Sequence, residues 1–205
     1  IPRPVFIEIT GTPSSGKSTT ITELNKYFKR LGLIVISPQE GAEVIRHIGR
    51  DTPLYNIRTA LYAINLLVDL SQGHKYDVVI FDRCIFDAFS WMEYWLEKNK
   101  LTLEEKEAFQ SFFMLRFWAP FIDAAFFMIC EPEEAMRREQ RISLSQKIGD
   151  YTNPETIRTL VDRHRKVFTK LKDEYPQLQL LDTTKMNEQE MIELVRAKIF
   201  ERLQI

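Results

Sequence analysis

The residues with the clearest chemical meaning lie near the start of the chain, in a stretch with the pattern G-x-x-x-x-G-K-S between an apolar run and an amphipathic run. Glycine lets such a loop curl until its backbone N–H groups point at a phosphate, and the following helix presents its N-terminus to the same anion. In this pattern Lys17 reaches the β- and γ-phosphates of a nucleotide, and the Ser18 hydroxyl binds Mg²⁺. The residues expected to bind the nucleotide are Gly11, Thr12, Pro13, Ser14, Ser15, Gly16, Lys17, Ser18 and Thr19.

A second group of candidate residues follows the apolar run at residues 78–81. Asp82 ends this run, and a carboxylate in that place can bind Mg²⁺ directly or through water. Arg83 can bind a phosphate or a substrate oxygen through two hydrogen bonds. Asp87 lies on the same face as Arg83 if a helix begins there, and both Asp87 and Phe86 are candidates for substrate contact. For Phe86 the alternative is packing in the core, which is the more frequent role of an aromatic stripe.

Glu40 follows another apolar run, at residues 33–36, and lies where that strand would end. Because open α/β sheets bind ligands at the C-terminal edge of their strands, we expect Glu40 to contact the substrate. The alternative is a carboxylate in the first turn of a helix, stabilised by the helix dipole. Glu40 and Asp82 are both candidates for a catalytic base, and the sequence does not separate them.

Arginines gather in a third segment, which begins at Pro132 and continues into polar residues 143–150. Arginines on a short helix before a polar loop are typical of a lid that closes during phosphoryl transfer, where they stabilise the charge on the transferred group. We therefore expect a lid at about residues 132–152, with Arg137 and Arg141 in catalysis and Arg138 at the nucleotide. The alternative is an ordinary charged, solvent-exposed helix face.

The elements that must position these groups alternate between strands and helices. Strands are expected at residues 5–10, 33–38, 78–82, 124–129 and 178–182, and Thr183, just after the last of them, is expected beside the phosphate-binding loop. Helices are expected at residues 18–31, 54–70, 101–118, 154–175 and 187–203, with others beginning near residues 83 and 132. Thr102 and Glu105 form a capping box for the helix at 101–118. The side chains of the 54–70 helix expected to pack on the sheet are Leu54, Ile57, Leu61, Ile64, and Leu67 or Val68.

This alternation predicts a single α/β domain over residues 1–205, a three-layer sandwich in which helices flank a five-stranded parallel sheet and a small helical lid is added. The composition fits a folded domain, because 44% of the 205 residues are hydrophobic. A formal net charge of −1 gives no electrostatic reason to expect nucleic acid or an anionic membrane as a partner. No apolar run is long enough to span a membrane.

The two cysteines, Cys84 and Cys130, have no metal-binding spacing, which argues against a disulfide scaffold or a zinc site and fits a reducing compartment. We therefore expect a cytoplasmic protein. A homodimer is possible.

With these groups in this order, the chain resembles the P-loop nucleoside and nucleotide kinases over nearly its full length. Residues 11–19 match their phosphate loop, and Asp82-Arg83 resembles the Asp-Arg or Glu-Arg pair that follows the third strand of thymidylate and deoxynucleoside kinases. Residues 40–46 resemble the segment that supplies a carboxylate base or substrate contacts in these enzymes, which implies that Glu40 and Arg46 bind the substrate. Asp82-Arg83, taken together with Asp87 and residues 40–43, is most similar to the small ATP-binding family related to ribosylnicotinamide kinase.

The chain also departs from thymidylate kinases in two places. Its arginine-bearing lid segment lacks their glycine-rich pattern, and Ser37-Pro38-Gln39 replaces their Arg-Glu-Pro sequence. Both differences argue against thymidylate as the substrate.

The resemblance implies an ATP- and Mg²⁺-dependent phosphotransferase that acts on a small nucleoside- or nucleotide-like acceptor. One alternative is a nucleotide-binding switch or regulatory ATPase module with slow hydrolysis, and another is a partner protein that has lost turnover. The Asn-Lys pairs at 25–26 and 99–100 lack the aspartate of a guanine-selective switch, and Arg83 lies where a motor ATPase would more often have glutamate.

Overall fold

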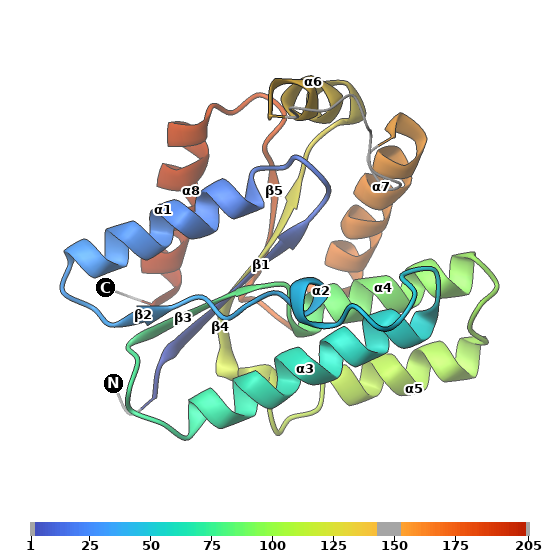
Figure 1. Ribbon diagram of the computed structural model, residues 1–205, viewed down its shortest axis with the longest axis horizontal. Coiled ribbons are helices and arrows are strands. Elements are labelled where there is room, and N and C mark those ends of the chain that lie inside the picture. Colours follow the sequence, from blue (N-terminus) through green and yellow to red (C-terminus); the bar gives the residue numbers. More distant parts are fainter. Residues whose placement is uncertain (1–2, 143–152, 204–205) are drawn as a thin grey trace.

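A computed structural model describes residues 3–142 and 153–203 of the chain. Its centre is a parallel sheet with the strand order β2-β3-β1-β4-β5 (Figure 1). The strands are β1 Val5–Gly11, β2 Val35–Ile36, β3 Val78–Asp82, β4 Ile122–Ile129 and β5 Leu178–Asp182. The predicted five-stranded parallel sheet is confirmed, with the phosphate-loop strand β1 at its centre.

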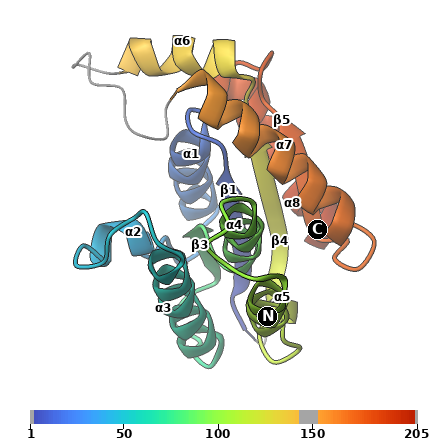
Figure 2. The same ribbon diagram turned by 90° about the vertical axis from the view of Figure 1, so that its right-hand side faces the viewer.

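Helices cover both faces of this sheet (Figures 1 and 2). Successive side chains of a strand point to opposite faces, so Phe6 packs under one helical layer whereas Ile7 and Ile9 pack under the other. The first layer contains α3 Pro53–Ser71, α4 Ile85–Glu97, α5 Leu103–Phe113 and α7 Pro154–Leu171, and the second contains α1 Lys17–Arg30 and α8 Glu188–Leu203. The short α2 Gly41–Val44 packs against α3, and α6 Pro132–Ile142 packs against α7. The predicted three-layer α/β sandwich is therefore confirmed.

Several predicted boundaries differ from those in the structure. The strand expected at 33–38 is only two residues long, and the helix expected at 154–175 ends at Leu171. The helix expected at 101–118 begins with the predicted capping box but ends at Phe113. There the chain turns back, and the Trp118 indole N–H donates to the Phe113 carbonyl at 2.9 Å before a short 3-10 helix, Ala119–Phe121. These endings depend on tertiary packing, which local periodicity does not report.

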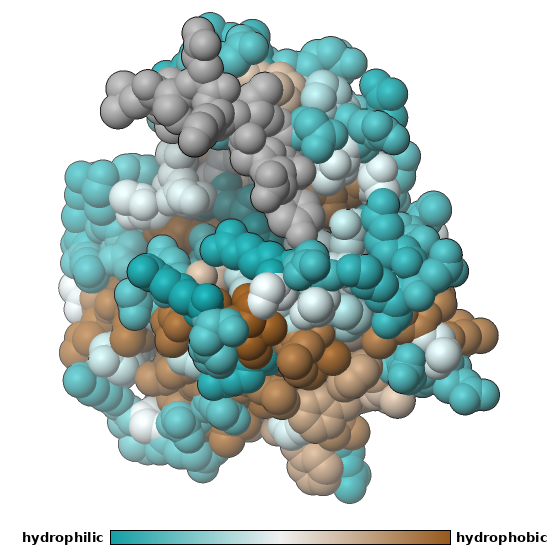
Figure 3. Space-filling model, turned by 45° about the vertical axis from the view of Figure 1, so that its right-hand side comes forward, coloured by the Kyte–Doolittle hydropathy of each residue, from teal (hydrophilic) through white to brown (hydrophobic). Residues whose placement is uncertain are grey.

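The prediction of which α3 side chains pack on the sheet is partly wrong. Leu54 and Leu61 are exposed, whereas Tyr55 and Asn56 are buried. Figure 3 shows hydrophobic surface on the lower part of the molecule, the side on which Figure 1 places α3 and α5. The helix is rotated from the expected orientation because part of its inward face lines a cleft rather than the core.

The lid is described only in part. Helix α6 corresponds to its arginine-bearing first half, and residues 143–152 lie outside the described residues. Within residues 3–142 and 153–203, no helix is both long and apolar enough to cross a membrane.

Candidate active site

The phosphate-binding loop connects β1 to α1 and depends on two glycines with positive φ angles. Gly11 has a φ of 140°, and a Cβ atom there would lie 1.8 Å from the Met128 carbonyl oxygen of β4. Gly16 has a φ of 93°, and a Cβ atom there would lie 2.5 Å from the Met191 sulfur. A side chain at Gly11 would clash with the backbone of β4. At Gly16 the Met191 side chain could move aside, but the positive φ angle still disfavours any residue other than glycine, so the motif needs glycine at both positions.

Lys17 lies over this loop. Its Nζ donates a hydrogen bond of 2.7 Å to the Thr12 carbonyl oxygen, and the Ser15 hydroxyl donates to the same oxygen at 2.9 Å. Burial lowers the pKa of Lys17 to about 8, and the positive charge of Arg83 adds to this effect. A phosphate at the loop would replace the carbonyl as the partner of this ammonium group and favour its charged form.

Asp82 ends β3 beside the loop, because its Cα pairs in register with Ile9 of β1. One carboxylate oxygen, Oδ1, is buried without a hydrogen-bond partner among the described residues, and burial raises the pKa of Asp82. A cation would satisfy this oxygen. The described residues contain no group of three acidic, His or Cys side chains that could hold a metal, but Mg²⁺ at phosphate sites uses one or two carboxylates together with phosphate oxygens and water. Asp82 and the exposed Ser18 hydroxyl fit that requirement.

Arg83 follows directly, in a turn with a φ of +69°. Its Nε lies 2.7 Å from a carboxylate oxygen of Glu40, the N-cap residue of α2, and its Nη1 lies 3.1 Å from a carboxylate oxygen of Asp87 on α4. Burial lowers the pKa of Arg83, but Asp87 and Glu40 outweigh that effect and raise it. Burial also raises the pKa of Glu40, against the opposing charge of Arg83. The structure thus brings together three of the residues predicted from sequence.

These three side chains line a cleft with a cavity volume of about 170 Å³. The cleft extends from the phosphate loop to α3, α4 and α7. Most of the residues that line it were not predicted from the sequence. Its other polar and aromatic lining residues include Arg50, Tyr55, Asn56, Tyr62, Ser90, Trp91, Arg163 and His164. One pattern in the sequence could have indicated this lining: the polar residues Tyr55, Thr59 and Tyr62 recur at helical spacing along α3.

The orientation of the Asn56 amide is fixed. Its Oδ1 accepts a hydrogen bond of 2.9 Å from the indole N–H of Trp95. Since the oxygen is engaged in this way, the amide NH₂ is the group that Asn56 can offer to a ligand.

Two residues predicted to contact the substrate, Phe86 and Arg46, do not line the cleft; the prediction is wrong for the buried Phe86 and stays a prediction for Arg46. Phe86 is fully buried in the core, where its ring meets Tyr175 edge to face at a centroid distance of 5.6 Å, and it does not line the cleft. Arg46 is exposed, and its Nε donates to the Glu43 carbonyl oxygen at 2.8 Å. Arg50, four residues later, lines the cleft instead.

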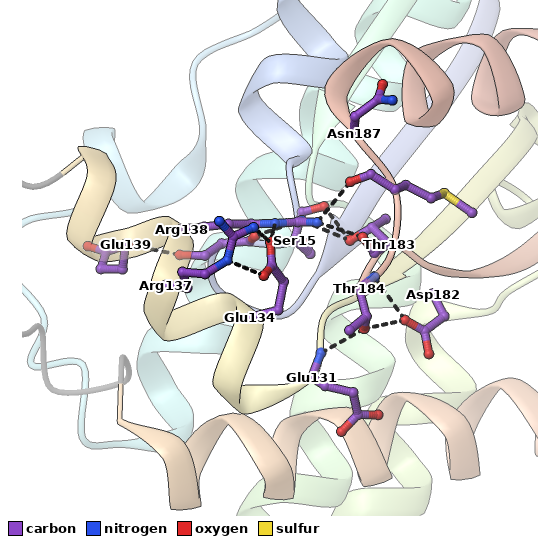
Figure 4. Close-up of polar contacts among 12 residues, drawn as sticks. Ser15, Glu131, Glu134, Arg137, Arg138, Glu139, Asp182, Thr183, Thr184 and Asn187 are labelled. Carbon is purple, nitrogen blue, oxygen red and sulfur yellow. Dashed lines mark hydrogen bonds and ion pairs between the residues drawn. The ribbon is translucent and has the colours of Figure 1, made fainter.

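The three arginines of α6 have different surroundings, drawn in part in Figure 4. Arg137 is half-exposed and forms two hydrogen bonds of 2.6 Å with Glu134 of its own helix, which hold the pKa of that carboxyl at about 2. Arg141 is exposed. Among the described residues, neither side chain makes a hydrogen bond to the phosphate loop, and their catalytic roles stay predictions.

Arg138 instead connects α6 to two other segments (Figure 4). Its Nε donates to Glu134 at 2.8 Å, and its Nη1 donates to the Ser14 carbonyl oxygen at 3.3 Å and to the Thr183 hydroxyl at 3.2 Å. Its Nη2 donates to the carbonyl oxygens of Thr183 at 2.6 Å and Met186 at 3.1 Å. All five N–H groups of the guanidinium are thus engaged by protein oxygens. Thr183 lies beside the loop, as predicted, because its hydroxyl donates to the Ser15 carbonyl oxygen at 3.0 Å. Arg138 also borders the loop, and its contact with the nucleotide stays a prediction.

Comparisons with known proteins agree with this architecture. The family model AAA_28, described as an AAA domain, matches residues 6–149. Among solved structures, the deoxyadenosine kinase of M. mycoides is similar with a TM-score of 0.66 and 17% identity, covering 96% of this chain and 100% of its own. The thymidylate kinase of Candida albicans is similar with a TM-score of 0.60 and 16% identity, covering 98% of this chain and 93% of its own. A search of curated proteins found no match. The chain therefore belongs to the AAA domain family AAA_28, and its fold is that of the P-loop nucleoside and nucleotide kinases.

Proposed function

We propose that this protein is a phosphotransferase, formed by one domain, that uses ATP and Mg²⁺ to phosphorylate a hydroxyl group of a small nucleoside-like acceptor. The observation that carries the proposal is the group Glu40, Arg83 and Asp87, which lines a cleft next to the phosphate loop. A module that only binds or hydrolyses a nucleotide has no need of such a cleft. A kinase needs it, because the acceptor must lie beside the γ-phosphate.

On the donor side, the loop amides and Lys17 would hold the β- and γ-phosphates, and Ser18 and Asp82 would hold Mg²⁺. The metal supplies positive charge to the phosphate oxygens. In the described part of the chain, Oδ1 of Asp82 is buried and has no hydrogen-bond partner, which supports the assignment of Asp82 to the metal rather than to the acceptor. Thr183 and Arg138 border the loop on the side where the base of the nucleotide would lie.

On the acceptor side, Arg83 is already paired with Glu40 and Asp87, and the Asp82 carboxylate also acts on it. In the cleft as a whole, the carboxylates of Glu40, Asp82 and Asp87 are matched by the guanidinium groups of Arg50, Arg83 and Arg163. A neutral hydroxyl can approach the Glu40 carboxylate without adding negative charge beside it, and we therefore assign a hydroxyl as the acceptor group.

Glu40 is the better candidate for the base that accepts the proton of this hydroxyl. Its side chain is about one quarter exposed at the cleft, and burial moves its pKa upward, toward the range that suits proton transfer near neutral pH. Arg83 would then hold both the carboxylate and the acceptor oxygen in place.

A second candidate is a nucleotide-binding module with slow hydrolysis. In its favour, Arg138 is fully engaged by protein oxygens, Arg137 is paired with Glu134, and Arg141 is exposed. An arginine at the transferred phosphoryl group accelerates such reactions strongly, so a site without one would turn over slowly.

The test is a transfer assay with labelled ATP, Mg²⁺ and a panel of nucleosides, nicotinamide riboside and mononucleotides. We expect the label to move to a nucleoside-like hydroxyl, and Lys17→Ala and Asp82→Asn to abolish the transfer. Glu43→Gln serves as the control, because Glu43 is an exposed carboxylate of α2 outside the cleft lining. If ATP turnover with the full panel is the same in the wild type, Lys17→Ala and Asp82→Asn, the proposal is wrong. Release of free phosphate without labelled acceptor favours the slow hydrolase.

A further inference from the structure

Glu8 is a fully buried carboxylate in the middle of β1 that neither the phosphate loop nor the cleft uses directly. Its Oε1 accepts hydrogen bonds from the backbone N–H groups of Cys84 at 2.8 Å and Asp87 at 2.9 Å. Its Oε2 accepts one from the N–H of Phe86 at 3.1 Å. Cys84 is the N-cap residue of α4, Phe86 and Asp87 lie in its first turn, and all three are more than seventy residues away from Glu8 in the sequence.

Helix α4 depends on this distant carboxylate because its own N-cap residue is Cys84, which makes no capping hydrogen bond through its side chain. The first N–H groups of a helix have no partner within the helix, and they attract negative charge. The Glu8 carboxylate, which belongs to the sheet, therefore accepts the hydrogen bonds that the side chain of a Ser, Thr or Asp at the N-cap normally accepts. The arrangement is unfavourable for the carboxylate itself, since burial raises the pKa of Glu8 to about 7 although the three N–H groups oppose that shift.

The turn that Glu8 holds contains Arg83 and leads into Asp87, and both residues line the proposed acceptor site. Arg83 has a φ of +69°, an uncommon conformation for a residue with a side chain, and its N–H donates to the Ile9 carbonyl oxygen at 3.1 Å. On the same face of β1, two residues after Glu8, the Thr10 hydroxyl donates a hydrogen bond to the Asp87 carboxylate. The strand before the phosphate loop thus holds both the backbone of the turn and one partner of Arg83.

We propose that Glu8 is a positioning residue, which fixes the start of α4 so that Arg83 and Asp87 keep their orientation toward the acceptor. This inference rests on the proposed kinase function. It extends that function by connecting the donor-side strand to the acceptor-side cluster through a residue that touches neither substrate.

The test is Glu8→Gln, which keeps the size of the side chain but places an NH₂ donor opposite a backbone N–H donor. We expect the affinity for an ATP analogue to stay within about twofold, since the phosphate loop is unchanged, and kcat with the acceptor to fall roughly tenfold to a hundredfold. Hydrogen exchange at residues 84–87 should become faster, whereas exchange in the phosphate loop should not.

A matched control separates positioning from general stability. Ile199→Ala removes a buried side chain of α8, in the other helical layer, and should lower Tm without lowering kcat. Both variants are assayed at a temperature at which each is fully folded. If Glu8→Gln loses no more kcat than Ile199→Ala, or if exchange at residues 84–87 is unchanged, the role of Glu8 is refuted. A wild type inactive toward every acceptor refutes the kinase function instead, and the exchange measurement still decides whether Glu8 holds α4.

Discussion

The arginines on the two sides of the phosphate loop differ in what holds them. Arg83 follows the last residue of β3, and its partners Glu40 and Asp87 come from two other elements at the cleft. Arg137 lies on the surface of α6 and is paired with Glu134, three residues away on the same helix. The position of Arg83 is set by the register of the sheet, whereas that of Arg137 is set only by its own helix.

Arg138 shows a third arrangement. Its side chain joins α6 to the phosphate loop and to the loop after β5, so it acts as a structural connection more than as a free cation. From this comparison we expect substitutions on the acceptor side to change the rate, and substitutions in α6 to change stability or nothing.

The largest effect is expected for Arg83→Gln. The change leaves Glu40 and Asp87 facing each other without their shared cation, so transfer to the acceptor should fall on the order of a thousandfold. Affinity for an ATP analogue should change little. Steady-state kinetics with the acceptor, together with a nucleotide titration, measures both. A loss of less than about threefold in kcat/KM would contradict the acceptor-side role of Arg83.

A somewhat smaller effect is expected for Glu40→Gln, on the order of a hundredfold in kcat. The base must be ionised, so the activity of the wild type should decline as the pH falls through the raised pKa of Glu40. The variant should lose this decline in its pH–rate profile. Glu43→Gln should keep both the rate and the profile. A wild-type profile that persists in Glu40→Gln would assign the proton transfer to another group.

Arg138→Ala and Arg137→Ala form a matched pair in α6. Removal of Arg138 breaks its hydrogen bonds within α6 and to two other segments, and it should lower the free energy of unfolding by about 2 kcal/mol or more. Removal of Arg137 breaks one exposed pair and should leave the free energy of unfolding almost unchanged. Urea unfolding of both variants compares them directly. Equal effects would mean that Arg138 is not a structural connection.

A pH-dependent effect is expected for His164, which borders the cleft from α7. Burial lowers the pKa of His164 to about 4, so the unfolded chain binds a proton at this residue below about pH 6.5 while the folded protein does not. Its contribution to stability is thus present above pH 6.5 and is lost as the pH falls toward 4, by about 3 kcal/mol at most. The difference in unfolding free energy between wild type and His164→Gln should follow this pH dependence.

Much of the fold could be predicted because its signals are local. The phosphate loop is a fixed spacing of glycines and lysine, and the strands are short apolar runs between helical patterns. The capping box of Thr102 and Glu105 was readable for the same reason, since both residues lie within one turn. Asp82 and Arg83 could be placed at the sheet edge because the ends of parallel strands meet there.

The side-chain partners could not be predicted in the same way. Phe86 and Asp87 are neighbours on α4, yet one packs in the core and the other pairs with Arg83. On α3 the apolar residues Leu54 and Leu61 are exposed while Asn56 is buried beside the cleft. Periodicity predicts that a helix has a buried face, but the direction in which that face points depends on the neighbouring elements.

The sequence by itself therefore determined a nucleotide-binding loop on a parallel α/β sheet, with an acid and an arginine at the end of a neighbouring strand, because each of these is encoded within a few consecutive residues. Only the tertiary structure decided that Arg83 is shared by Glu40 and Asp87, that Arg138 is engaged by carbonyl oxygens, and that Glu8 caps α4. Each of these contacts joins segments far apart in the chain. Their free energies depend on distances and burial that exist only once the sheet and its two helical layers have assembled.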